Sequence, residues 1–232
     1  MRVIVFDTET TGLPQSKIIN PDTLTSWPHI VQFSYVVYDV SNNDIPISFD
    51  KVVKLTDGIT IPEDSTLIHG ITNEMSIKTG FPIYEILDKF FHSLKNADML
   101  VGHNISFDIN MVKVELLRLI YSNNFNVSEK EITRYKYNLH LLTNFTNIYC
   151  TLQESIDFCN IKAVSKYGKE YLKYPKLVEL HKKLFETIPH NLHNSFNDIL
   201  VTLRCFMKLK YDLDLEIECK KFKSITRRKK LF

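Results

Sequence analysis

Residues 3–9 have the sequence Val-Ile-Val-Phe-Asp-Thr-Glu, in which an unbroken apolar run leads directly into two acidic residues. A short run of β-branched and aromatic residues is typical of a strand that is buried on both faces of a sheet. We therefore expect a central strand at this point of the chain. Because alternate residues of a strand point to the same face, Asp7 and Glu9 should project together from the end of that strand.

This pair of carboxylates has two interpretations. Like charges held side by side repel each other unless one is protonated or a cation lies between them, and oxygen-rich acidic sites suit Mg²⁺ or Mn²⁺. The alternative is an exposed, solvated turn in which neither carboxylate binds anything. The Asp-x-Glu pattern alone does not distinguish a metal site from such a turn.

Further strands are predicted after this stretch in the sequence. Apolar or alternating residues with Asn/Asp-rich turns between them occur at 29–40 and 51–55, and they favour strands antiparallel to the first one. Met99-Leu100-Val101 forms another apolar run that ends at a glycine. The sheet is therefore expected to be mixed.

Helices are predicted between and after these strands. Apolar residues recur at helical spacing over residues 83–94, 107–121, 177–185 and 194–209. Helices interleaved with strands around one apolar sheet indicate an α/β fold with a central mixed sheet flanked by helices.

Three segments have a biased composition. Residues 122–144 are polar and aromatic-rich without a clear period, which favours an insertion or a mobile cover over a cleft. Basic and aromatic residues alternate over 166–176, a composition suited to phosphate contact and base stacking, although a solvated surface strip explains it nearly as well. The basic C-terminal tail, residues 211–232, is open to three interpretations: contact with nucleic acid, recruitment of a partner, or disorder.

Composition excludes some classes of protein and leaves others open. The formal net charge of +2 is too small to indicate a nucleic-acid partner by itself. No uninterrupted apolar stretch approaches the roughly 20 residues of a membrane helix, and the first residues do not resemble a secretion signal. We expect an intracellular protein, cytoplasmic or nuclear and not secreted. The four cysteines lack C-x-x-C spacing, which favours reduced structural thiols over a zinc site or disulfides.

Two later segments carry further candidates for chemistry. In Gly102–Asp108 a predicted strand leads into a helix, where a carboxylate at Asp108 is favoured by the unpaired backbone N–H groups; a simple helix-start charge is the alternative. In Leu192–Asp198 a histidine precedes a helix that carries an aspartate in its first turns. His193 on a loop can take a proton from water while Asp198 binds metal, or the two residues are merely a cap-region pair.

Taken together and in this order, the three segments resemble the DnaQ-like (DEDDh) 3′→5′ exonuclease family of the ribonuclease H-like superfamily. Phe6–Pro14 (FDTETTGLP) resembles its first motif, His103–Asp108 its second, and His193–Asp198 its third. The resemblance implies a ribonuclease H-like three-layer fold. It further implies an exonuclease domain over residues 1–210, followed by the basic tail at 211–232.

The resemblance also assigns roles to the acidic residues and the histidine. It implies that Asp7, Glu9 and Asp198 hold one metal ion, and that Asp7 and Asp108 contact a second, Asp108 partly through water. The expected cofactor is thus Mg²⁺ or Mn²⁺, two ions per active site, as in other two-metal hydrolases. His193 would be the general base, a role typically worth about 10²–10⁴-fold in rate.

The resemblance also implies which residues contact the terminal nucleotide of the substrate. These residues are Thr8, Leu13, Ile68, His69, Asn104 and Phe107. Leu13 would wedge against the terminal base, the Thr8 backbone would meet the terminal sugar, and His69 would face the substrate. Core packing is the alternative for Leu13, Ile68 and Phe107.

The function expected from the resemblance is metal-dependent 3′→5′ exonuclease activity that releases nucleoside 5′-monophosphates. The expected partner is a nucleic acid with a free 3′ end, single-stranded or frayed DNA in preference to RNA. A polymerase or repair partner is also expected, and the oligomeric state is not predicted. Two alternatives stay open: a 3′→5′ exoribonuclease, and a catalytically silent nucleic-acid-binding or polymerase-accessory module.

Overall fold

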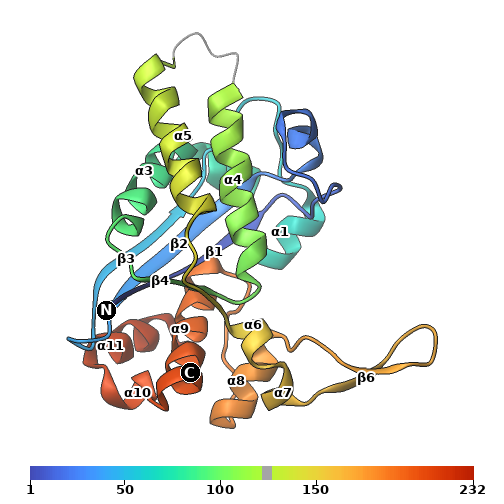
Figure 1. Ribbon diagram of the computed structural model, residues 1–232, viewed down its shortest axis with the longest axis vertical. Coiled ribbons are helices and arrows are strands. Elements are labelled where there is room, and N and C mark those ends of the chain that lie inside the picture. The colour runs from blue at the N-terminus through green and yellow to red at the C-terminus, as the bar shows by residue number, and fades with distance from the viewer. Residues whose placement is uncertain (122–126) are drawn as a thin grey trace.

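A five-stranded mixed sheet forms the centre of the molecule in the computed structural model, which describes residues 1–121 and 127–232 (Figure 1). The strand order is β3-β2-β1-β4-β5. The bounds are β1 Arg2–Thr10, β2 Ile30–Asp39, β3 Asp44–Val52, β4 Met99–Gly102 and β5 Ile148–Cys150. The central strand β1 pairs antiparallel with β2 and parallel with β4. The expected central strand and mixed sheet are confirmed.

Helices cover both faces of this sheet, which gives the expected layered α/β fold (Figure 1). One face carries α3 Ile83–Leu94, α4 Ile105–Tyr121 and α5 Glu129–Thr143. The other carries α9 Ser195–Tyr211, with α8 Leu177–Phe185, α10 Leu215–Glu218 and α11 Lys220–Lys229 around it. Alternation along β1 serves both layers, because Ile4 and Phe6 enter the first core whereas Val3 and Val5 enter the second.

Shorter elements connect these layers. They are the 3₁₀ helix η1 Pro21–Ser26, α1 Glu63–His69, α2 Asn73–Thr79, α6 Thr151–Glu154, α7 Ile156–Cys159, and the strands β6 Lys162–Val164 and β7 Glu170–Leu172. The last two strands pair antiparallel in a separate hairpin that projects from the body (Figure 1).

Two expected elements differ from the structure. The strand expected at 51–55 instead spans Asp44–Val52, because the turn after β2 leads directly into a hairpin with it. No helix was predicted within 122–144, the segment interpreted as an insertion or a mobile cover, but Glu129–Thr143 of it forms α5. Ser128 and Glu131 form a reciprocal cap at its start, and the buried residues Tyr135, Asn138 and Leu142 follow at helical spacing. Residues 122–126 of that segment lie outside the described residues.

The C-terminal segment, residues 211–232, is ordered as α10 and α11. Leu215, Phe222 and Ile225 are buried in the same core as Val3 and Val5, so the interpretation of this segment as disordered is wrong. The functional boundary expected near residue 210 stays a prediction. Across the described part of the chain, each helix is too short or too polar to span a bilayer.

Candidate active site

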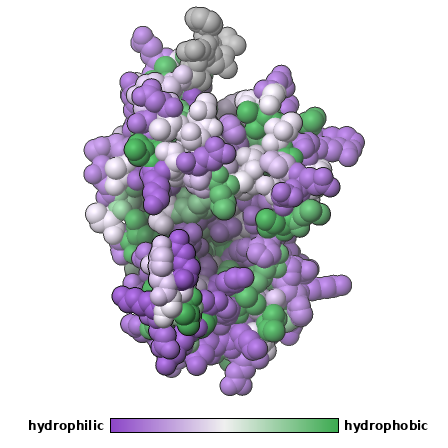
Figure 2. All heavy atoms as spheres, turned by 90° about the vertical axis from the view of Figure 1, so that its right-hand side faces the viewer, coloured by the Kyte–Doolittle hydropathy of each residue, from purple (hydrophilic) through white to green (hydrophobic). Residues whose placement is uncertain are grey.

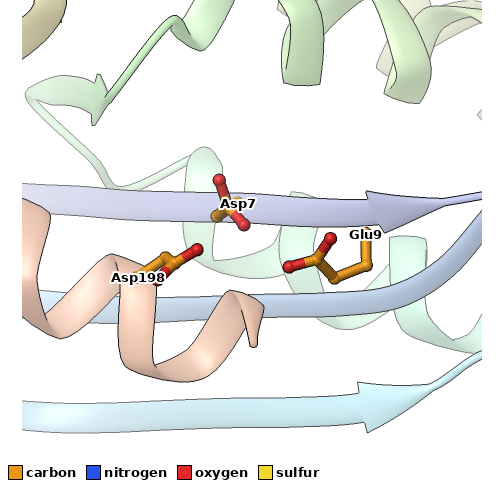
Figure 3. A group of neighbouring side chains, drawn as sticks. All are labelled: Asp7, Glu9 and Asp198. Atoms are coloured by element: carbon orange, nitrogen blue, oxygen red, sulfur yellow. The ribbon is translucent and has the colours of Figure 1, made fainter. Parts of the chain in front are cut away.

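Three carboxylates meet where β1 ends beside the first turns of α9. Asp7 and Glu9 lie on the same face of β1 as Val3 and Val5, which is the face that α9 covers. Asp198 projects from α9 toward them, and Figure 3 shows the three carboxyl groups turned toward one another. One carboxylate oxygen from each residue lies within 4.8 Å of the other two. The structure therefore brings together Asp7, Glu9 and Asp198, which are far apart in the sequence.

Crowding and partial burial oppose full ionisation of this cluster. Burial raises the pKa of Asp7 well above its ordinary value, and the charges of Asp108, Asp198 and Glu9 raise it further. Burial raises the pKa of Glu9 from 4.5 to about 7. The pKa of Asp198 rises from 3.8 to about 8 because of burial and then the charge of Glu9. Without a cation, the protein resists placing full negative charge here.

The donor set fits a divalent metal ion. All three side chains offer carboxylate oxygens, which are the ligands that Mg²⁺ and Mn²⁺ prefer. The Oδ1 atom of Asp198 is buried and has no hydrogen-bond partner among the described residues. A buried acceptor without a donor is costly, and a cation bound between the carboxylates would satisfy it.

Asp108 lies beside this cluster but is held by a different contact. It is buried in the first turn of α4 and accepts hydrogen bonds from the Thr8 backbone N–H at 2.9 Å and the Thr8 hydroxyl at 2.7 Å. Burial raises the pKa of Asp108 to about 7, whereas the two Thr8 bonds lower it. Thr8 points to the face of β1 opposite Asp7, so Asp108 reaches the end of β1 from the other layer. Its charge nevertheless contributes to the raised pKa of Asp7.

Sheet topology explains how Asp108 comes to this place. Because β1 and β4 are parallel neighbours, their carboxyl ends lie at the same edge of the sheet. The chain leaves β4 at Gly102, where an added Cβ would lie 2.9 Å from the Ile105 Cβ, so glycine permits the tight entry into α4. Asn104 in this turn is exposed and has a left-handed backbone, with φ of 68°.

His103 anchors this turn, a role that the sequence did not indicate. Its ring Nε2 donates to the Pro175 carbonyl at 3.0 Å, and its Nδ1 lies 3.0 Å from the Thr151 hydroxyl. Burial lowers the pKa of His103 to about 4, so the ring is neutral at physiological pH. His103 therefore joins the second motif to two other segments rather than acting as an acid or base.

His193 lies on an exposed loop before α9, as expected. Its backbone is left-handed, with φ of 65°, and its N–H donates to Asp198 Oδ2 at 3.3 Å. The loop is held from two sides, because the His190 N–H donates to the Leu231 carbonyl at 2.8 Å and the Asn197 side chain donates to the Asn191 carbonyl at 2.7 Å. The loop backbone is thus fixed beside Asp198, while the imidazole is exposed to solvent.

The expected substrate contacts fall into exposed and buried groups. Leu13 is 81% exposed and Ile68 is 61% exposed, so core packing does not account for either side chain. Phe107 is half-buried and packs against the core of the α3–α5 layer, which leaves the packing interpretation open for it. His69 is buried, and its Nδ1 accepts the Ile71 N–H at 3.1 Å. Thr8 is buried through its contact with Asp108.

Two polar residues of β2 support the site and were not singled out from the sequence. The Ser34 hydroxyl is buried and lies 2.6 Å from the Ser195 hydroxyl at the start of α9, and Gln32 Oε1 accepts the Ser195 N–H at 3.3 Å. Ser34 is also the direct cross-strand partner of Asp7. The signal in the sequence was two polar side chains within an otherwise apolar strand, IVQFSYVV.

Comparison with known proteins identifies a family and relatives of this chain. A family model described as Exonuclease, RNase_T, matches residues 4–206. The DNA polymerase III subunit epsilon of Buchnera aphidicola subsp. Acyrthosiphon pisum is 34% identical over 117 residues, which are 50% of this chain and 44% of that protein. The subunit epsilon of Buchnera aphidicola subsp. Schizaphis graminum is 29% identical over 153 residues, 66% of this chain and 54% of that protein.

Solved structures share the fold. Exonuclease I of E. coli in complex with a dT13 oligonucleotide matches with a TM-score of 0.60 at 16% identity, over 89% of this chain and 41% of that one. Exonuclease I of Methylocaldum szegediense matches with a TM-score of 0.55 at 14% identity, over 97% of this chain and 43% of that one. This chain therefore spans about half the length, or less, of these relatives.

Proposed function

This chain belongs to the exonuclease family that the RNase_T model describes, and on that premise we propose that it is a metal-dependent 3′→5′ exonuclease acting on single-stranded or frayed DNA. The observation that carries the proposal is the meeting of Asp7, Glu9 and Asp198 within 4.8 Å, with the buried Asp198 Oδ1 lacking a donor among the described residues. A solvated turn, the alternative for the Asp-x-Glu pattern, would not place a third carboxylate against the pair. The products would be nucleoside 5′-monophosphates.

In the proposed reaction the four carboxylates hold two metal ions, and Asp7 contacts both. Asp7, Glu9 and Asp198 would hold one divalent ion, and Asp7 with Asp108 would hold a second. Two Mg²⁺ or Mn²⁺ ions bound by these residues would supply activation of a water molecule and stabilisation of negative charge on the leaving oxygen. Thr8 fixes the carboxylate of Asp108 through the two hydrogen bonds described above.

His193 is proposed to accept the proton of the attacking water. Its backbone N–H donates to Asp198, so His193 is next to a member of the acidic cluster, and its exposed side chain is free to turn toward substrate. A neutral imidazole nitrogen can accept a proton from water, which suits a general base. Leu13, Ile68, His69, Asn104 and Phe107 are proposed to line the position of the terminal nucleotide.

DNA is proposed as substrate because the relatives are named as DNA polymerase III subunits and because the matching E. coli structure holds a dT13 oligonucleotide. The same names support a polymerase partner, and a repair partner and an intracellular location are proposed with it. A 3′→5′ exoribonuclease and a silent accessory module are the competing functions.

The test is the product pattern of 5′-labelled single strands of DNA and of RNA, incubated with Mg²⁺, Mn²⁺ or EDTA. The proposal expects a descending ladder from DNA that requires the metal. Equal shortening of RNA would remove the preference for DNA. Strands that are bound but stay intact in every condition would instead support the accessory module.

A further inference from the structure

The hairpin of β6 and β7 extends away from the body of the molecule as an arm, defined here as residues 161–176 (Figure 1). A two-stranded hairpin is at best marginally stable in water unless something packs on it. Within the described residues, β6 and β7 have extensive contacts only with each other. Two tyrosine side chains of the arm are therefore largely exposed: Tyr167 is 84% exposed and Tyr174 is 63% exposed. The arm therefore presents rings to solvent that no part of the described body covers.

Charge indicates what kind of partner would cover this surface. The arm has five lysines and one acidic residue, Glu170. The lysines are Lys162, Lys166, Lys169, Lys173 and Lys176. Of these, only Lys173 forms an ion pair with a described carboxylate, at 2.6 Å from Glu179. The other four leave a positive surface that complements a polyanion rather than an apolar protein face.

The order of side chains along β7 fits a single strand of nucleic acid. Backbone hydrogen bonds continue the pairing of the hairpin beyond β7 to Lys169 and Lys173, so these two residues share one face with Tyr171. Successive side chains on that face lie about 6.7 Å apart. At the tip, Lys166 Nζ lies 5.0 Å from the centre of the Tyr167 ring. Rings for stacking bases, interleaved with cations for phosphates, are the features by which proteins bind single strands without sequence preference.

The root of the arm is joined to the candidate active site. The Pro175 carbonyl, at the end of the arm, accepts the hydrogen bond from His103 Nε2 at 3.0 Å. His103 lies in the turn from β4 to α4 that places Asp108. Figure 2 views the molecule from the side to which the arm projects. In this view, residues of hydrophilic and intermediate hydropathy stand in front of a hollowed part of the surface. A strand bound at the carboxylates by its 3′ end can therefore continue along the arm.

We propose that the arm binds the single-stranded part of the substrate upstream of its 3′ end, with the four lysines that lack an ion pair contacting phosphates and Tyr167 and Tyr171 stacking on bases. This inference rests on the proposed function, because it assumes that the substrate is a nucleic-acid strand. It adds a second contact region, which holds the strand but takes no part in hydrolysis.

Two arm variants and one matched control test the proposal by fluorescence anisotropy of 5′-labelled dT20 in EDTA over a series of salt concentrations. Lys166→Gln with Lys169→Gln should lower the slope of log affinity against log salt by about 1.4, which is about 0.7 for each lost phosphate contact. Tyr167→Ser with Tyr171→Thr should weaken binding at least about fivefold and leave the slope unchanged. Lys136→Gln with Tyr137→Ser, two exposed residues of α5, should change neither quantity.

Hydrolysis of long and short strands separates this inference from the proposed function. With dT20 the arm variants should show a raised KM and an unchanged kcat. With dT3, which offers fewer nucleotides to the arm, the rise in KM should be much smaller. Wild-type protein that binds dT20 but cleaves nothing would defeat the proposed function while the anisotropy still tests the arm. Wild-type affinity and salt slope in both arm variants, with melting temperatures unchanged, would overturn the inference and direct attention to a protein partner.

Discussion

Replacing Asp198 by asparagine should stabilise the metal-free protein while abolishing its activity. The pKa of this carboxyl is raised from 3.8 to about 8 in the folded state, so at pH 7 the folded protein opposes an ionisation that the unfolded chain permits. One pKa unit corresponds to about 1.4 kcal/mol, which gives an upper limit of about 4 kcal/mol at pH 7. Solvent screens this half-buried carboxyl, and part of the shift comes from repulsion by Glu9. We therefore expect Asp198→Asn to raise the free energy of unfolding by about 2 kcal/mol.

The sign of the pH dependence follows from the direction of the shift. A carboxyl whose folded pKa is raised destabilises the fold above its unfolded pKa, and the penalty grows until the pH reaches the folded pKa. The advantage of Asp198→Asn should therefore be near zero at pH 4, increase through neutral pH and level off near pH 8. Saturating Mn²⁺ should stabilise the wild type more than the variant, because a ligand that binds only the folded state adds stability by mass action.

Differential scanning calorimetry in EDTA and in Mn²⁺ measures both effects. For a chain of this length a gain of about 2 kcal/mol corresponds to roughly 4–8 °C in Tm. Asp212→Asn at the other end of α9 is the matched control, because the Asp212 side chain is 88% exposed and should shift Tm little. An unchanged or lower Tm of Asp198→Asn in EDTA at pH 7 would refute the electrostatic reasoning.

Three further changes test the supports of the site by steady-state kinetics. His193→Ala should lower kcat by about 10²–10⁴-fold and leave Mn²⁺ binding intact by calorimetric titration, and loss of Mn²⁺ binding would show that His193 is a ligand instead. Thr8→Val removes a hydrogen bond that lowers the pKa of Asp108, so the rise of activity with pH should move to higher pH; an unmoved profile would contradict a metal-ligand role for Asp108. Asn197→Ala removes the hydrogen bond to the Asn191 carbonyl, so we expect a larger change in kcat than in KM, with kcat lowered. An unchanged kcat would show that the loop carrying His193 does not need this hydrogen bond.

Strands and helices with a clear hydrophobic pattern were predicted from the sequence. The apolar run before Asp7 places a strand with both faces buried, and the period of 83–94 matches α3 residue by residue. Helix α5 was missed because its start depends on a reciprocal cap and only a narrow stripe is buried. In α11 the many cations concealed Phe222 and Ile225, which lie at helical spacing and enter the core.

The candidate site could be predicted only in part from residues alone. Alternation places Asp7 and Glu9 on one face, but nothing local in the sequence brings Asp198 to them; that expectation came from resemblance to a family. The bond between Thr8 and Asp108 and the anchoring of His103 depend on how separate layers meet, so neither follows from local pattern.

The most direct test of the metal site is hydrolysis of 5′-labelled single-stranded DNA by the wild type and by Asp7→Asn, each with Mn²⁺ and with EDTA. Asp7 is the residue proposed to contact both ions, and its replacement by asparagine keeps the shape of the side chain while removing the charge. The account predicts stepwise shortening from the 3′ end only by the wild type with Mn²⁺, with Asp7→Asn folded and inactive. Wild-type cleavage by Asp7→Asn, or cleavage in EDTA, would contradict it.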